Sequence, residues 1–350
     1  MEQTELADRL LAGPRGRDLC LYVSGTDPFE VITATYLAKR RPDVGGDGNR
    51  VVWMSGRLWT PDTSAALALA VAARAAVPAK KLKGRRLLET LADVVGEAAY
   101  WQPPGDQEKA ADDPTVTDAL RPVAAAVAAA PDAGWWTRPY LANDQPYVSW
   151  IEDERATRAT PPPLTGVTDR LTEWRREAQQ PGSVWWSTPN RWDVVTTAPS
   201  SRHVAAIQLA LVEDSQGWHR ARVARLQPRP EARVYEVGGV EDWTALVEAY
   251  PLDVGASRGR SWHALTGRDH RWLLPDWPRV AHDYDGVHLT VLAYLSGAGR
   301  ALPAAGGMTV LAGWEPDVTI WLTDALSQAE NPTTWIATQP TRSTTRWRPA

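Results

Sequence analysis

The sequence predicts an α+β protein in which a mainly helical N-terminal region precedes an α+β domain with a mostly antiparallel sheet. Apolar residues recur at helical spacing over most of the first third of the chain. Later in the chain, short runs rich in Val, Tyr, Trp and Thr alternate with Gly, Pro and Asp, which is typical of strands joined by turns. Between these regions lies TPPPLTG (160–166), whose successive prolines cannot continue a helix. We therefore expect a helical domain at 1–160, an α+β domain with the active site at 161–325, and a loosely held polar tail at 326–350.

Helix-capping residues and helix-breaking Gly and Pro residues define the elements expected in the N-terminal region. The GPRG stretch at 13–16 ends the first helix, because Gly and Pro interrupt helical hydrogen bonding. The short apolar run DLCLYVSG (18–25) predicts a buried strand, and Asp27 with Pro28 predicts the start of a helix. The other expected elements are helices at 3–12, 27–41 and 60–77, a strand at 50–59, and helices in RRLLETLADVVGEAAYW and VTDALRPVAAAVAAA around a polar loop at 102–114.

The C-terminal region is expected to supply the sheet. Two helices interrupt its strands, GGVEDWTALVEAYPL with acidic residues in its first turn, where the helix dipole favours them, and the shorter LPDWPRVAHDYD. The expected strands are SVWWST, RWDVVTT, AIQLALVED, RARVARL, ARVYEV, GVHLTVLAYL, GMTVLAGW and DVTIWL.

Composition restricts the class of protein. The net charge of −4 argues against a general nucleic-acid binder, which needs a basic surface to neutralise phosphates. The single cysteine, Cys20, excludes an internal disulfide framework and is typical of a reducing cytoplasm. No apolar stretch reaches the length of a membrane span. We therefore expect a cytoplasmic protein with neither a nucleic acid nor a membrane as its partner.

Tryptophan is unusually common, with 19 Trp residues against a single Phe. Trp has a large apolar ring and one N–H that needs a partner, so it suits core margins and pocket walls. Two roles stay open: Trp replaces Phe as the large core residue, or exposed Trp rings bind a partner of a non-enzymatic, regulatory protein. The accompanying excess of Arg, Ala and Pro is typical of GC-rich genomes and indicates an actinobacterial source.

The segment PDWPRVAHDYDGVHLTVLAYL (275–295) contains the strongest candidate for a metal site. His282, Asp285 and His288 supply the ligand types of a non-haem iron or zinc centre. Their spacing, however, does not place the two histidines on one helical face, as an H-E-x-x-H motif does. The alternative is a short helix, an Asp-Gly turn and a buried strand, with Asp285 and His288 beside a pocket.

Several common catalytic motifs do not occur in the sequence. There is no G-x-S-x-G nucleophile elbow, no P-loop motif, and no G-x-G-x-x-G dinucleotide fingerprint after an expected strand. Cys20 lies in an apolar run, which favours an inert thiol.

Residues 182–243 resemble ADP-ribosyltransferases. The resemblance rests on VWWSTP (184–189) followed by EARVYEVGGVEDW (231–243), an aromatic strand that ends in Ser-Thr and a later strand that carries an acid. It implies that Ser187 and Thr188, with Trp186 as an aromatic wall, line a nicotinamide pocket. It further implies that Glu236 or Asp242 stabilises the ribosyl cation, and that Tyr22 takes the place of a first-strand tyrosine. Other segments, such as GWEPDVTIWL, resemble uncharacterised actinobacterial proteins, which implies no mechanism.

The first functional hypothesis is therefore an NAD-using transferase or glycohydrolase that acts on an unknown small-molecule or protein acceptor. Glu236, Asp242, Asp285 and His288 are its candidate catalytic residues, and Tyr22, Trp186, Ser187 and Thr188 its candidate NAD-binding residues. The alternatives are a metal-dependent enzyme of specialised metabolism, with iron or zinc on His282, Asp285 and His288, and a Trp-rich binding protein. Ordinary amphipathic strands with Glu236 in solvent would produce the same pattern.

Overall fold

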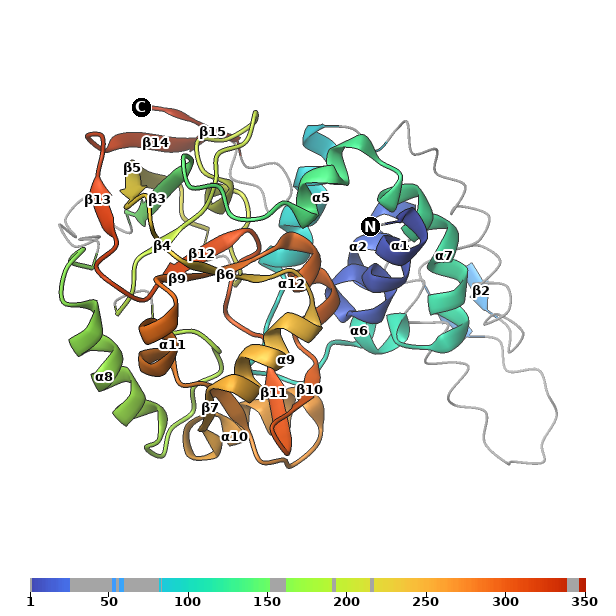
Figure 1. Cartoon of the computed structure of the whole chain (residues 1–350). Coiled ribbons are helices and arrows are strands. Elements are labelled where there is room, and N and C mark those ends of the chain that lie inside the picture. Colours follow the sequence, from blue (N-terminus) through green and yellow to red (C-terminus); the bar gives the residue numbers. More distant parts are fainter. Residues whose placement is uncertain are drawn as a thin grey trace.

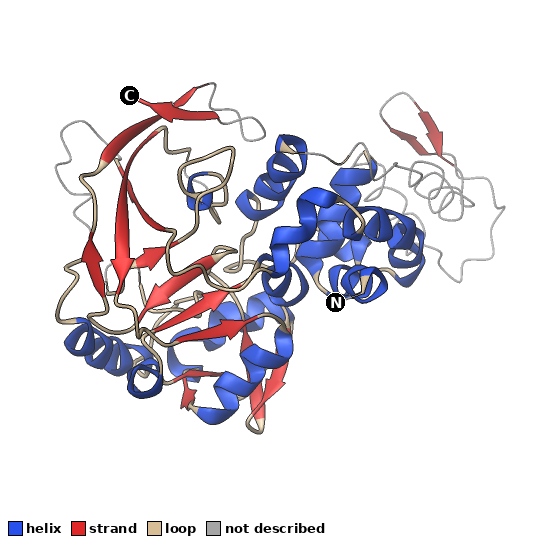
Figure 2. Ribbon diagram, turned by 45° about the horizontal axis from the view of Figure 1, so that its top comes forward, coloured by secondary structure: helices blue, strands red, loops and turns tan. Residues whose placement is uncertain are grey.

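The computed structural model describes residues 2–25, 52–54, 57–59, 82, 84–151, 162–190, 193–214, 217–338 and 346–350. The described chain is α+β, as the sequence predicts (Figure 1). Its N-terminal part is helical, whereas its C-terminal part combines helices with sheets whose strands pair mostly antiparallel. Figure 2 shows the N-terminal helices gathered on one side and the larger sheets on the other, with further helices beside the sheets.

The described residues of the N-terminal part form five helices: α1 (Gln3–Ala12), α2 (Pro14–Ser24), α5 (Arg85–Gly96), α6 (Asp106–Ala111) and α7 (Pro114–Ala128). Helix α2 packs against the other four. The strand expected at 18–25 is wrong, because these residues belong to α2. Leu19, Cys20 and Leu21 are all fully buried, so this helix is apolar on several faces and its run shows no helical period.

A four-stranded sheet lies at the centre of the C-terminal part. Its strand order is β4 (Thr196–Thr197), β12 (Val318–Trp321), β9 (Gly286–Leu289) and β6 (Val234–Val237). Strand β9 pairs antiparallel with β12 and parallel with β6. This register sets His288 opposite Glu236 on one side and Thr319 on the other.

The apolar run after His288 changes from strand to helix. Strand β9 ends at Leu289, and helix α12 (Val291–Gly297) begins after Thr290, whose hydroxyl accepts a hydrogen bond from the Ala293 backbone N–H. The strand expected through this whole run is therefore wrong beyond Leu289. All of α12 is buried, and it packs against α1 and α2 as well as against α9 (Val240–Ala249).

A second sheet has five strands: β3 (Gln145–Trp150), β5 (Arg220–Pro228), β13 (Leu326–Gln328), β14 (Thr333–Thr338) and β15 (Arg346–Pro349). Strands β13, β14 and β15 lie in the segment 326–350, which was expected to be a loosely held tail. This expectation is wrong for the described residues. Strand β3 precedes the prolines at 161–163 yet pairs with β5 along its whole length.

The remaining elements include α8 (Val167–Ala178), α10 (Gly255–Thr266), α11 (Trp277–Asp283) and the 3-10 helices η2 (Pro131–Thr137) and η3 (Ile207–Leu209). Two short hairpins join β1 (Val52–Met54) to β2 (Arg57–Trp59) and β10 (Ala301–Ala304) to β11 (Gly307–Val310). Strands β7 (Pro251–Asp253) and β8 (Leu273–Pro275), which lie on either side of α10 in the chain, also pair antiparallel.

Further expectations have mixed outcomes. The strand predicted at 50–59 contains the β1–β2 hairpin, SVWWST is a loop, and AIQLALVED contains η3. The helices expected at 27–41 and 60–77 lie outside the described residues, whereas α5, α7, α9 and α11 are confirmed.

One large hydrophobic cluster joins the two parts of the described chain. It extends from the N-terminal helices through α12 to α9 and the four-stranded sheet. Six tryptophans of this cluster are among the largest fully buried side chains: Trp136, Trp243, Trp262, Trp272, Trp277 and Trp314. A seventh, Trp321, is fully buried in a smaller cluster. Among the described large apolar side chains only Trp101 is exposed. Most of the tryptophans whose burial the structure describes are therefore core residues.

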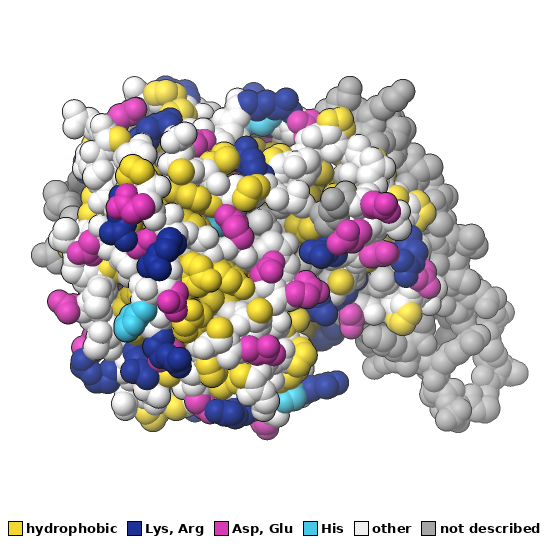
Figure 3. All heavy atoms as spheres, in the orientation of Figure 1, with side chains coloured by type: hydrophobic (Ala, Val, Ile, Leu, Met, Phe, Trp, Pro, Cys, Tyr) yellow, Lys and Arg dark blue, Asp and Glu magenta, His cyan; other side chains and the backbone are white. Residues whose placement is uncertain are grey.

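Two surface properties bear on partners. No described helix combines the length and the apolar character that a membrane crossing needs. On the face drawn in Figure 3, acidic and basic side chains are interspersed between apolar ones, so the described part of this face has no extended area of one sign.

Candidate functional site

The central polar feature of the fold is a histidine held between two carboxylates. His288 is 1% exposed, and its Nδ1 lies 2.7 Å from Glu236 Oε2 while its Nε2 lies 3.2 Å from Asp317 Oδ1. Since both acceptors are carboxylates, both ring nitrogens donate and the ring is an imidazolium. Burial by itself lowers the pKa of His288, but the hydrogen bonds and charges of Asp317 and Glu236 outweigh it and raise the pKa to about 9.

Strand pairing assembles this triad from three distant segments. The parallel pairing of β6 with β9 places Glu236 beside His288. Asp317 directly precedes β12, and its N–H donates to the Leu289 carbonyl at 2.8 Å. The backbone of Asp317 has φ of 62°, a left-handed conformation that is costly for a residue with a side chain and is often found at functional sites.

Glu236 has a second anchor. Its Oε1 accepts a hydrogen bond of 2.7 Å from the Tyr140 backbone N–H, and its side chain is 34% exposed. The Tyr140 ring packs edge-on against Trp321, with centroids 5.8 Å apart. Burial, together with the charge of Glu236, raises the pKa of the Tyr140 hydroxyl. Glu236 therefore orients His288 and is itself fixed by a backbone group.

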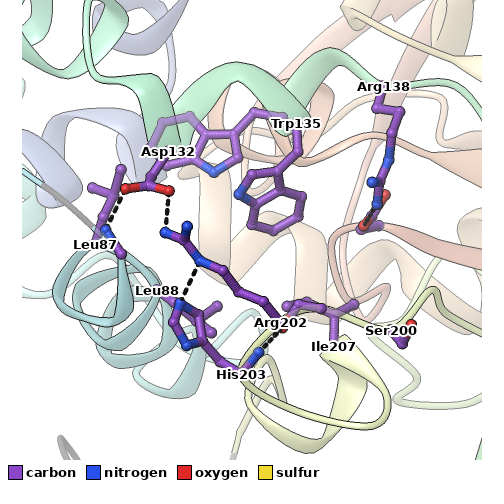
Figure 4. A pocket seen from close by; sticks show the side chains of 13 residues that line it. Leu87, Leu88, Asp132, Trp135, Arg138, Ser200, Arg202, His203 and Ile207 are labelled. Atoms are coloured by element: carbon purple, nitrogen blue, oxygen red, sulfur yellow. Dashed lines mark hydrogen bonds and ion pairs between the residues drawn. The ribbon is translucent and has the colours of Figure 1, made fainter.

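A cavity of about 570 Å³ lies next to Asp317 (Figure 4). This volume is typical of small-molecule pockets. Its walls come from α5, from η2 with the residue after it, and from the segment 200–207. The lining residues are Gly84, Leu87, Leu88, Asp132, Trp135, Trp136, Arg138, Ser200, Ser201, Arg202, His203, Ile207 and Asp317.

One side of the cavity carries a paired group of charges. Asp132 accepts hydrogen bonds from the Gly84 N–H and from Arg202. The Nε of Arg202 donates to His203 Nε2 at 3.0 Å. Burial and the neighbouring Arg202 lower the pKa of His203, so its ring is neutral and accepts this bond.

The other side carries Asp317 and Arg138. Asp317 Oδ2 is buried and has no hydrogen-bond partner among the described residues, and Arg138 Nη2 lies 3.8 Å from it. The Nε of Arg138 is likewise buried without a partner in the described chain. In the view of Figure 4, Trp135 lies between Arg138 and the Arg202–Asp132 pair. The cavity thus offers a carboxylate oxygen, two guanidinium groups and an indole ring.

Of the four acidic or basic residues predicted to be catalytic, two come together and two do not. Glu236 and His288 are in direct contact. Asp242 accepts from the Gly238 N–H at 2.9 Å and stabilises the first turn of α9. Asp285 is buried and bound by Arg229, by the Arg233 N–H and by the Thr323 hydroxyl, so its carboxylate ties β9 to neighbouring loops.

The four residues expected to bind NAD have other partners. The Tyr22 hydroxyl donates to Glu97 at 2.6 Å on the helical side of the molecule. The hydroxyls of Ser187 and Thr188 donate to the carbonyls of residues 312 and 313, and Trp186 packs edge-on against Trp185. None of the four lines the cavity or contacts Glu236 in the hydrogen bonds and ring contacts of the described chain.

The proposed metal ligands also remain apart. His282 lies exposed at the end of α11, Asp285 is bound by arginine, and His288 is held by Glu236 and Asp317. Within the part of the chain that the structure describes, no group of three or more His, Cys, Asp or Glu side chains could hold a metal ion.

Asp317 and the cavity-lining charges were not predicted from the sequence. Asp317 is the first residue of the expected strand DVTIWL, where an acid at the start of a strand is an ordinary turn residue. Arg138 lies in GWWTRPY, a segment noticeable only for its aromatic residues. Neither Asp317 nor Arg138 belongs to a recognised sequence motif, because the chemistry of each residue depends on partners far away in the chain.

These observations define an α+β protein in which a buried carboxylate–histidine–carboxylate triad ends at the wall of a ligand-sized cavity. Comparison with family models finds no match, and neither the curated proteins nor the solved structures searched contain a match to this chain.

Proposed function

We propose that the protein binds a small organic ligand in this cavity and acts on it through the carboxylate of Asp317. The observation that carries the proposal is Asp317, a residue that lines the cavity and whose buried Oδ2 has no hydrogen-bond partner among the described residues. Burying a polar atom without a hydrogen-bond partner destabilises the fold, so its presence here favours a role in binding or catalysis. His288 and Glu236 are positioning residues, since His288 holds the other oxygen of Asp317.

The chemistry of the walls indicates the ligand class. Arg138 and Arg202 favour an anionic group such as a phosphate, and Trp135 favours a planar ring. The Asp317 carboxylate in the same cavity wall stabilises positive charge that develops on the ligand. A nucleotide with a good leaving group at its ribose meets all three requirements.

NAD is the concrete candidate, which retains the predicted class of reaction but moves the acid to Asp317. The C–N bond between ribose and nicotinamide breaks, its electron pair goes to the ring nitrogen, and neutral nicotinamide leaves. Asp317 stabilises the ribosyl cation, and water adds to the same carbon with release of a proton. In a transferase a nucleophilic acceptor takes the place of water.

Nicotinamide release from NAD by the purified protein tests this reaction. We expect Asp317→Asn to lower the rate by about 10²–10³-fold, the effect typical of losing one electrostatic contact to a transition state. Asp118→Asn, an exposed aspartate of α7, should leave the rate unchanged. Absence of nicotinamide release from the unsubstituted protein would refute the NAD reaction.

A second comparison separates the candidate acids. Asp242→Asn should have little effect on the rate, because Asp242 stabilises the start of α9. A large loss in Asp242→Asn with normal activity in Asp317→Asn would favour the acid that the resemblance implies. A thermal shift assay with NAD tests ligand binding separately from turnover.

A further inference from the structure

A second buried polar cluster surrounds Glu213, away from the triad. Both carboxylate oxygens of Glu213 are buried and have no partner with hydrogen-bond geometry among the described residues. The hydroxyls of Tyr100 and Tyr294 lie near this carboxylate, and the Tyr100 hydroxyl donates to that of Tyr294 at 3.2 Å. A buried carboxylate in such surroundings is far more stable in its neutral form.

The charged and titratable groups that face Glu213 come from several elements. They are Arg15 on α2, Tyr100 after α5, Tyr294 on α12 and Glu315 after β11. Arg15 is also buried, but it pairs with Asp18 at 3.5 Å and with Glu108 on α6, so its charge is already shared. Burial first, and then the charge of Glu315, raise the pKa of Glu213 to about 8, whereas the tyrosines and Arg15 lower it.

The position of the cluster links it to the cavity. Glu213 follows the wall segment 200–207 in the chain, and Tyr100 follows α5, whose Leu87 and Leu88 form another wall. Tyr294 belongs to α12, which packs against α1 and α2. The cluster therefore ties two walls of the cavity to the N-terminal helices.

We propose that protonated Glu213 acts as a latch between the N-terminal helices and the cavity wall at 200–207, and that raising the pH through the neutral range loosens this side of the cavity. An opening that exposes Glu213 to water returns its carboxyl to ordinary solvation. The neutral carboxyl favours the closed latch, and ionisation favours the open one. The regulation is independent of which ligand the cavity binds.

Hydrogen–deuterium exchange of the segments 84–100 and 200–214 tests the latch, with Glu213→Gln as a neutral replacement of nearly the same shape. At each pH, the exchange rate of the unsubstituted protein is divided by that of the variant, which cancels the intrinsic pH dependence of exchange. We expect this ratio to rise about a hundredfold between pH 6 and pH 9, as one ionisation linked to opening requires. A ratio that stays constant refutes the latch.

Two further measurements keep the test decisive. Glu248→Gln, an exposed residue of α9, is the matched control and should follow the unsubstituted protein at both pH values. If Glu213→Gln does not fold, the unsubstituted protein alone is compared between 200–214 and α9 after correction for intrinsic exchange. Equal pH dependence in these two segments then overturns the proposal, and selective loosening of 200–214 supports it.

Discussion

At the scale of single residues, the triad has a distinct dependence on pH. The pKa of His288 is about 9 in the folded protein because two carboxylates stabilise the imidazolium, against about 6.5 for an ordinary histidine. The stabilising contribution is thus fully present below about pH 6.5 and is lost as the pH rises through about 9. The neutral carboxyl of Glu213 also contributes to stability, because its pKa of about 8 lies above the ordinary value of 4.5. Its contribution is therefore lost between those two values.

Replacing His288 by Gln should remove the first of these contributions. We expect the free energy of unfolding at pH 6 to fall by about 3 kcal/mol, because the pKa shift then no longer favours the folded state. The loss should shrink as the pH approaches 9.5. Urea unfolding at several pH values measures it, and a loss that is independent of pH would contradict the imidazolium assignment.

At the scale of elements, the change from strand to helix at Thr290 positions His288. The Thr290 hydroxyl caps α12 by accepting from the Ala293 N–H and donates to the Val237 carbonyl on β6. It therefore fixes the end of β9 relative to both neighbours. The sequence predicted one continuous strand here, because an apolar run of this length does not distinguish strand from buried helix.

Substituting Thr290 by Ala should destabilise the protein by about 1–2 kcal/mol, the usual cost of losing an N-cap. Thr172→Ala is the matched control, since Thr172 is exposed in the middle of α8 and its hydroxyl donates to the Thr168 carbonyl within the same helix. Chemical denaturation compares the two variants. Equal effects would show that the cap at Thr290 is not the stabilising contact.

At the scale of the whole molecule, the N-terminal helices and the α+β part share one hydrophobic cluster. The domain boundary expected near residue 160 rested on prolines, which break a helix but do not separate cores. Strand β3 lies before those prolines and pairs with β5 after them. Tertiary packing thus joins the two parts of the chain that the change of sequence pattern near residue 160 predicted to be separate domains.

This shared core predicts that the two parts unfold together. Circular dichroism reports the helices of both parts, and tryptophan fluorescence reports mainly the α+β part, which contains six of the seven largest fully buried Trp rings of the described chain. The two probes should give coincident urea transitions. Separate transitions would show that the two parts are stable independently.

The sequence by itself determined the fold class, most helices and strands, and two members of the triad. Glu236 and His288 were both predicted as candidate catalytic residues, because an acid and a histidine lie in or beside apolar runs that predict buried strands. Only the tertiary structure paired β6 with β9 and placed Asp317 against His288. The cavity charges likewise come from segments far apart in the chain. The local sequence pattern shows how often buried residues recur along a segment. The site instead depends on pairing between distant segments, which no local pattern encodes.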